Sequence, residues 1–154
     1  MTAALEKDAV KLACTTCGQM NRVPLDKLGS GPKCGTCGEP LVSGKVAELD
    51  PKALAAVSKK DELAVIVDFW APWCGPCRQM APEFSKAAQA LKGRARFAKI
   101  NTEEHPSVSA KNGIRGIPAL ILYQGGKEIA RLAGARPAKD IIAFVEQSAK
   151  LPRP

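Results

Sequence analysis

Residues 45–150 alternate between strand-like and helix-like patterns of hydrophobic positions. Residues 63–70, LAVIVDFW, form a nearly continuous apolar run, which is typical of a central strand covered on both faces. Weaker strand patterns occupy residues 46–49, 94–101 and the two halves of 119–134, where Gln124-Gly125-Gly126 predicts a hairpin turn. The sequence therefore predicts several strands, with 63–70 at the centre of their sheet.

Helical patterns separate these strands. Asp50 and Pro51 predict an N-cap and first helical residue for a helix that runs to Lys59. Apolar residues recur every three or four positions between 76 and 92, and a short helix is predicted over 103–113. Pro137 opens a last helix that buries Ile141, Phe144 and Val145. The order βαβαβα followed by ββα predicts an α/β fold in which helices flank a mixed central sheet.

The first part of the chain has a different pattern. Residues 12–42 are rich in Gly, Thr and Cys, contain only short strand signals, and include a turn signal at Ser30-Gly31-Pro32. We predict two domains, 1–43 and 44–154, joined through the short link SGKV. Only the tail, residues 151–154, is expected to fray.

Composition narrows the class of protein. The chain has 154 residues, with 45% hydrophobic and 25% charged residues, which is typical of a soluble globular protein. No apolar run approaches the roughly 18 residues of a membrane span, and the N-terminal sequence lacks the pattern of a signal peptide. The net charge is +8, but the basic residues are spread along the chain and aromatic residues make up only 5%. We expect a cytoplasmic monomer that binds neither nucleic acid nor membrane.

Cys74 and Cys77 are placed where a strand becomes a helix. Gly75 and Pro76 allow a tight turn and begin the helix, and residues three apart share a helix face, so the two sulfur atoms can meet. Free N–H groups at the helix N-terminus favour the thiolate of Cys74. We predict that Cys74 attacks a substrate disulfide and that Cys77 resolves the mixed disulfide. The alternative is half of a metal site, but the other four cysteines form a complete set among themselves.

Asp68 interrupts the apolar strand shortly before this pair. Burial of a carboxylate is costly and raises its pKa, so Asp68 is expected to be partly protonated. Its position beneath the cysteines suits a group that accepts the Cys77 proton, with Lys99 as a possible charge partner. The alternative is a carboxylate that only caps a nearby backbone group.

Cys14, Cys17, Cys34 and Cys37 form two C-x-x-C pairs separated by 16 residues, which is the pattern of a four-cysteine zinc site. Gly18 and Gly38 follow the pairs and ease their turns. Four thiolates close a tetrahedral site, and metal binding would stabilise a unit too small to fold on its own hydrophobic core. Iron, an accessory redox role and disulfides remain alternatives. His105, far along the chain, is expected to be a surface residue and not a ligand.

The segments VDFWAPWCGPC, GIRGIP and LAGARP resemble thioredoxins in order and spacing over residues 44–150. This resemblance implies the thioredoxin fold, a cis peptide bond before Pro118, and a shallow docking surface beside the redox pair. The resemblance assigns to this surface Trp73, Gly75, Pro76, Gly116, Ile117, Pro118, Gly134 and Ala135.

The whole chain resembles the zinc-containing thioredoxin 2 family, through CTTC, KCGTCGEPL and VIVDFWAPWCGPCR. The resemblance implies a cytoplasmic protein-disulfide reductase with a zinc-ribbon domain and no organic cofactor. Its partners would be disulfide-containing substrate proteins and an NADPH-dependent thioredoxin reductase. The second hypothesis is a zinc-based redox sensor or chaperone-like binding module.

Overall fold

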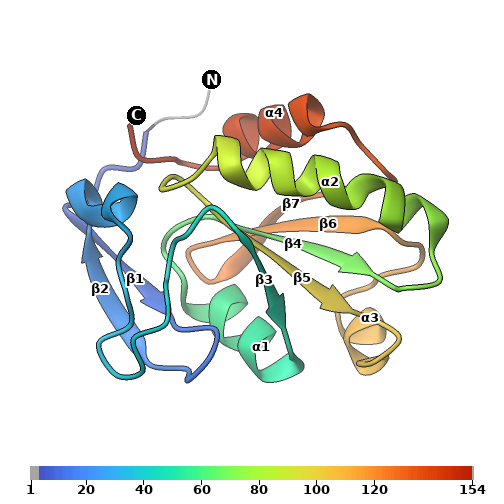
Figure 1. Ribbon diagram of the computed structural model, residues 1–154, viewed down its shortest axis with the longest axis horizontal. Helices are drawn as coiled ribbons and strands as arrows, with labels where there is room; N and C mark the ends of the chain where they lie inside the picture. The colour runs from blue at the N-terminus through green and yellow to red at the C-terminus, as the bar shows by residue number, and fades with distance from the viewer. Residues whose placement is uncertain (1–3, 154) are drawn as a thin grey trace.

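A central strand, β4 (Val65–Trp70), organises the sheet of the computed structural model, which describes residues 4–153. β4 pairs in parallel with β5 (Arg96–Asn101), and β5 pairs in parallel with the edge strand β3 (Val46–Leu49). On its other side β4 pairs antiparallel with β6 (Ala119–Gln124), which turns into β7 (Lys127–Ala133). The strand order β3-β5-β4-β6-β7 confirms the predicted mixed sheet (Figure 1).

Helices cover both faces of this sheet. α2 (Gly75–Ala90) and α4 (Ala138–Ser148) pack on one face, while α1 (Pro51–Lys60) and α3 (Ser107–Lys111) pack on the other (Figure 1). Side chains alternate along β4, so Ile66 points to the α2 face and Val67 to the α1 face. Asp68 therefore lies on the α2 face, two residues beyond Ile66.

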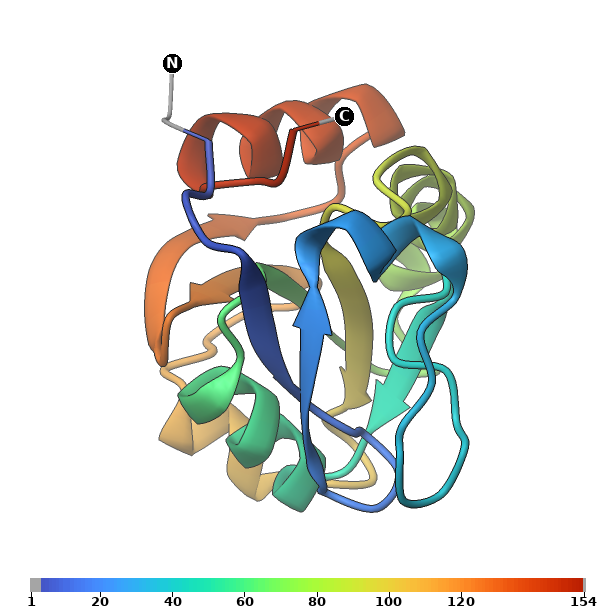
Figure 2. The same cartoon turned by 90° about the vertical axis from the view of Figure 1, so that its left-hand side faces the viewer.

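The N-terminal unit is a small ribbon at one end of the sheet (Figure 2). β1 (Ala9–Ala13) pairs antiparallel with β2 (Met20–Pro24), and a 3-10 helix, η1 (Leu25–Ser30), follows. Its hydrophobic core includes Leu12, Leu28 and, from the segment that leads into β4, Leu63. The ribbon and the larger unit thus share a core residue.

Most predicted elements are confirmed, with ends that differ by a few residues. The short helix is reduced to Ser107–Lys111, and Phe144 is half-buried beside the core instead of fully buried. The expectation of a frayed tail was wrong for its described part. Leu151 is buried, and its carbonyl accepts a hydrogen bond of 3.0 Å from the N–H of Leu5.

The ends of the two predicted domains, residues 1–3 and 154, lie outside the described residues. Among residues 4–153, none of the helices has the length and apolar character needed to cross a membrane.

Candidate active site and four-cysteine centre

Cys74 and Cys77 form a disulfide at the N-terminus of α2, with their Cα atoms 5.2 Å apart. Cys74 is the N-cap residue, and its sulfur accepts a hydrogen bond of 3.2 Å from the N–H of Cys77. The same sulfur lies 3.7 Å from the carbonyl oxygen of Ile117, on the loop before β6. The predicted place of the pair at a strand-to-helix junction is confirmed.

Asp68 lies below this disulfide and is only 3% exposed. A cavity of about 180 Å³ connects it with Cys77, Trp70 and Lys99. Burial raises the pKa of the Asp68 carboxyl to about 7, and the positive charge of Lys99 offsets only part of this effect. Oδ1 of Asp68 and Nε1 of Trp70 have no hydrogen-bond partner within the described part of the chain. Within the described residues, the carboxyl therefore combines an unpartnered buried oxygen with a pKa near neutrality.

Lys99 is the strand neighbour of Asp68 but pairs with other groups. Its Nζ lies 3.4 Å from Oε1 of Glu48 and 4.8 Å from the ring centroid of Trp70. Lys99 therefore acts on Asp68 through its charge across the cavity, and among the described contacts of residues 4–153 no hydrogen bond joins the two side chains.

Ile117, one of the residues predicted to form the docking surface, packs against the buried cluster that contains Cys74 and Cys77. Trp73 is 66% exposed, and the bond between Ile117 and Pro118 is cis, as the resemblance implied. The Gly134 N–H donates a 2.9 Å hydrogen bond to the Pro118 carbonyl, which joins the loops before β6 and after β7. Pro118 itself is buried, while the other members are exposed or half-buried: Gly75, Pro76, Gly116, Ile117, Gly134 and Ala135.

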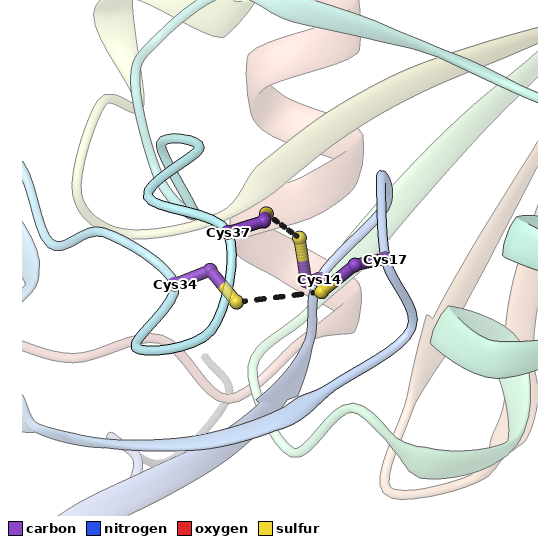
Figure 3. Close-up of side chains that lie close together, drawn as sticks. All are labelled: Cys14, Cys17, Cys34 and Cys37. Carbon is purple, nitrogen blue, oxygen red and sulfur yellow. Dashed lines mark hydrogen bonds between the residues drawn. The ribbon is translucent and has the colours of Figure 1, made fainter.

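The four ribbon cysteines converge at two matching turns (Figure 3). All four sulfur atoms lie within 4.8 Å of one another, and those of Cys14 and Cys37 are 3.6 Å apart, as are those of Cys17 and Cys34. Zinc–sulfur bonds of about 2.3 Å in a tetrahedron place the sulfur atoms about 3.8 Å apart. The cluster therefore fits a tetrahedral metal ion held by four thiolates.

At this centre, hydrogen bonds favour the thiolate form of Cys34. The backbone of Cys37, followed by the side-chain amide of Asn21, lowers the pKa of the Cys34 thiol to about 6. The Asn21 Nδ2 lies 3.5 Å from the Cys34 sulfur, and its Oδ1 accepts a 2.9 Å hydrogen bond from the Gly35 N–H. Asn21 thus fixes the second turn and donates to one of its sulfur atoms.

Two protein-family models match the chain. A family model described as thioredoxin matches residues 45–147, and another, described as thioredoxin 2, N-terminal, matches residues 13–39. The chain belongs to the thioredoxin family. Thioredoxins are protein-disulfide oxidoreductases, so the chain is an oxidoreductase that works by dithiol–disulfide exchange through its WCGPC segment.

Individual relatives agree with this assignment. Thioredoxin C-3 of Corynebacterium nephridii is 38% identical over 136 residues, which cover 88% of this chain and 93% of that protein. Thioredoxin of Synechocystis sp. is 40% identical over 101 residues, which cover 63% of this chain and 94% of that protein. The crystal structure of chloroplastic thioredoxin z superimposes with a TM-score of 0.62 at 31% identity, covering 67% of this chain and 93% of that chain. The structure of a mutant thioredoxin from Halobacterium salinarum superimposes with a TM-score of 0.63 at 25% identity. The match covers 73% of this chain and 97% of that chain.

Two features of the thioredoxin site and its surroundings were missed by sequence reasoning. Trp70 lines the Asp68 cavity, and it was not predicted as a site residue. Its place two residues after Asp68 on a strand was the available signal, because such residues share a face. The second feature is a buried ion pair between Asp61 and Arg96, which both hydrogen-bond the backbone of Ala13 in the ribbon. No local sequence pattern predicts this pair.

Proposed function

We propose that Cys74 is the attacking cysteine of this protein-disulfide reductase and that Cys77 resolves the mixed disulfide. The Cys74 thiolate attacks one sulfur of a substrate disulfide, that bond breaks, and one substrate thiolate leaves. Cys77 then attacks Cys74, forms the disulfide described here, and releases the second substrate thiol. The support is the N-cap position of Cys74, where unpaired helix N–H groups stabilise an anion.

We propose Asp68 as the group that accepts the Cys77 proton. The observation that carries this role is the cavity shared by Asp68 and Cys77, in which the carboxyl has an unpartnered oxygen. The cavity is large enough for water to pass the proton between the two groups. A pKa near 7 suits both uptake and release of a proton at neutral pH. Lys99 limits the rise of that pKa.

Substrate segments are proposed to dock beside the disulfide, across Trp73, Pro76, Gly116 and Ile117, with Gly75, Pro118, Gly134 and Ala135 completing the surface. Pro118 has no N–H, and the exposed backbone around Ile117 can pair with an extended segment. The mostly apolar surface favours unfolded or flexible segments that present a disulfide.

For the ribbon we propose a structural zinc ion bound by Cys14, Cys17, Cys34 and Cys37. Four sulfur ligands leave no open position for catalysis, so the zinc supplies folding energy and not chemistry. We further propose that an NADPH-dependent thioredoxin reductase regenerates the dithiol, that the domain boundary lies between residues 43 and 44, and that the protein works in the cytoplasm. A monomer without nucleic-acid binding stays a prediction.

Paired serine variants test the proposed roles of the cysteines. Cys74→Ser should abolish insulin-disulfide reduction, whereas Cys77→Ser should accumulate a mixed disulfide with the substrate that gel electrophoresis detects. Both variants should retain the zinc of the wild-type protein, measured on the same samples. Reductase turnover that persists in Cys74→Ser would show that the proposed mechanism is wrong.

A separate variant tests Asp68. Asp68→Asn should slow turnover at pH 7 by about 100-fold, the lower end of the range that a general base contributes. The pH profile should also lose the step near the Asp68 pKa of about 7. An unchanged profile would remove Asp68 from the proton transfer while leaving the cysteine roles intact.

A further inference from the structure

Three arginines adjoin the proposed docking surface. In the sequence Arg78 follows Cys77, Arg115 precedes Gly116, and Arg136 follows Ala135, and all three side chains are exposed. Arg78 lies in the first turn of α2, and the other two lie on the loops before β6 and after β7. The start of α2 and these loops gather at the end of the sheet where β4 ends (Figure 1). The hydrogen bond between Gly134 N–H and the Pro118 carbonyl ties two of these loops together. The arginines therefore adjoin three different segments of the proposed docking surface.

Among the described residues, these guanidinium groups have no carboxylate partner. The ion pairs found within residues 4–153 involve other side chains. Arg78 Nη1 donates a 2.8 Å hydrogen bond to the Pro72 carbonyl, and Arg136 Nη2 donates a 3.0 Å hydrogen bond to the Ala133 carbonyl. A guanidinium has five N–H donors, so these single bonds orient the groups and leave most donors available.

The carboxylates on this side of the molecule lie outside the three segments that carry the arginines. Glu83 is held by Lys86 and by the N–H of Ala138, and Asp140 follows the exposed Lys139. Other acidic residues, Glu103 and Glu104, lie after β5 in the turn where the Thr102 N–H bonds the Trp70 carbonyl. Segments 71–78, 112–118 and 134–137 therefore carry positive charge only, while Glu103 and Glu104 lie in the separate turn after β5.

We propose that Arg78, Arg115 and Arg136 form an arginine rim that selects partner segments whose disulfide is flanked by carboxylates. This inference rests on the docking surface of the proposed function and adds the chemistry of the partner to it. Arginine suits the role because its planar fork binds a carboxylate through two parallel hydrogen bonds. Exposed ion pairs are weak individually, so the rim acts mainly on the rate of association.

Three disulfide peptides test the rim in a single turnover. The peptides share one Cys–Cys loop and differ only in flanking residues, which are Glu, Gln or Lys. One reduced protein molecule reduces one peptide disulfide, so that two protein thiols become the Cys74–Cys77 disulfide and the peptide gains two thiols. Starting from pre-reduced protein removes any need for a reductase. The measurement is the second-order rate constant, by chromatography of the peptide, at low salt and at about 0.3 M salt.

At low salt the Glu peptide should react about ten times faster than the Lys peptide, and this ratio should shrink at high salt. In the triple variant Arg78→Gln, Arg115→Gln, Arg136→Gln the ratio should fall close to one. The matched control replaces the exposed lysines of α1, Lys52→Gln, Lys59→Gln and Lys60→Gln. This lysine control also removes three positive charges, but from a site beside the first cysteine turn of the ribbon and away from the disulfide. Its ratio of Glu-peptide to Lys-peptide rate constants should equal that of wild type.

Failure of the rim and failure of the proposed function give different results. A wild-type ratio near one, with the Gln peptide still reduced, overturns the rim alone. A ratio that falls equally in the lysine control also overturns it, because net charge would then explain the preference. If the wild-type protein reduces none of the three peptides, the docking function itself is wrong.

Discussion

Burial of Asp68 both raises the pKa of its carboxyl toward neutrality and lowers the stability of the folded protein. Burial raises its pKa from 3.8 to about 7, so the folded protein holds a proton there that the unfolded chain releases above pH 4. The folded state then binds more protons between those values, and stability falls as pH rises from about 4 to about 7. The free-energy cost of burying the ionised Asp68 carboxylate is fully present above pH 7 and lowers the stability of the folded state by about 4 kcal/mol, as an order of magnitude.

Asp68→Asn removes this penalty because the amide does not ionise. The oxidised variant should be more stable than wild type by a few kcal/mol at pH 8, and this difference should disappear near pH 4. Urea unfolding at several pH values measures it. Asp26→Asn, at an exposed position of η1, is the control and should show no such trend. A constant difference between Asp68→Asn and wild type would contradict the assigned ionisation.

Asn21 plays a comparable supporting role at the four-cysteine centre. Its side chain contacts the Cys34 sulfur and the Gly35 N–H, so Asn21→Ala should release one turn of the site and weaken metal binding. Groups that support metal ligands typically contribute about 10–100-fold in affinity. Competition with a chelator measures this loss. Gln19→Ala removes only a side-chain bond to the Met20 carbonyl and should leave affinity within about twofold, well below that range.

At the scale of elements, the hairpin between β6 and β7 is fixed by two glycines with unequal surroundings. Both have positive φ, +65° at Gly125 and +86° at Gly126. An added Cβ at Gly126 would lie 2.8 Å from the Lys59 carbonyl at the end of α1, whereas at Gly125 it would meet nothing within 4 Å. The hairpin and the end of α1 are therefore in direct contact.

Alanine at these two positions separates backbone strain from close contact. Gly125→Ala should cost about 1–2 kcal/mol for its left-handed conformation alone. Gly126→Ala should cost at least about 1 kcal/mol more, because the added methyl group must displace backbone. Urea unfolding of both variants gives the comparison. Equal losses would mean that the α1 contact yields without cost.

The elements themselves followed from local pattern, since alternation of apolar residues and the signals at Asp50-Pro51 and Gly125-Gly126 involve neighbouring residues. The redox pair and the metal ligands were predictable for the same reason, as spacing within a few residues defines them. The Asp61–Arg96 pair and the shared core position of Leu63 join residues far apart in the sequence. Such contacts depend on how elements pack, which no local pattern specifies.

At the scale of the whole molecule, a buried clamp holds the ribbon against the thioredoxin sheet. Asp61, after α1, accepts a 2.8 Å hydrogen bond from the Ala13 N–H, and Arg96 of β5 donates one of 2.9 Å to the Ala13 carbonyl. Asp61 and Arg96 also form an ion pair with each other, and they are 1% and 7% exposed. Ala13 directly precedes Cys14, so the clamp positions the first turn of the metal centre.

Arg96→Met should therefore damage both units at once. It leaves the Asp61 carboxylate buried without its partner, which should cost about 3–5 kcal/mol of stability. The Ala13 carbonyl also loses its donor, and zinc should pass to a chelator faster than from wild type. Pairing the change with Asp61→Leu removes the stranded charge and should recover much of the stability but not the slow zinc release.

The control Lys7→Met breaks the exposed ion pair with Glu62 and should lower stability by less than about 1 kcal/mol. Urea unfolding and the rate of zinc transfer to a chelator are measured for wild type, the two single variants and the double variant. If Arg96→Met matched Lys7→Met in both measurements, the buried pair would not hold the ribbon against the sheet.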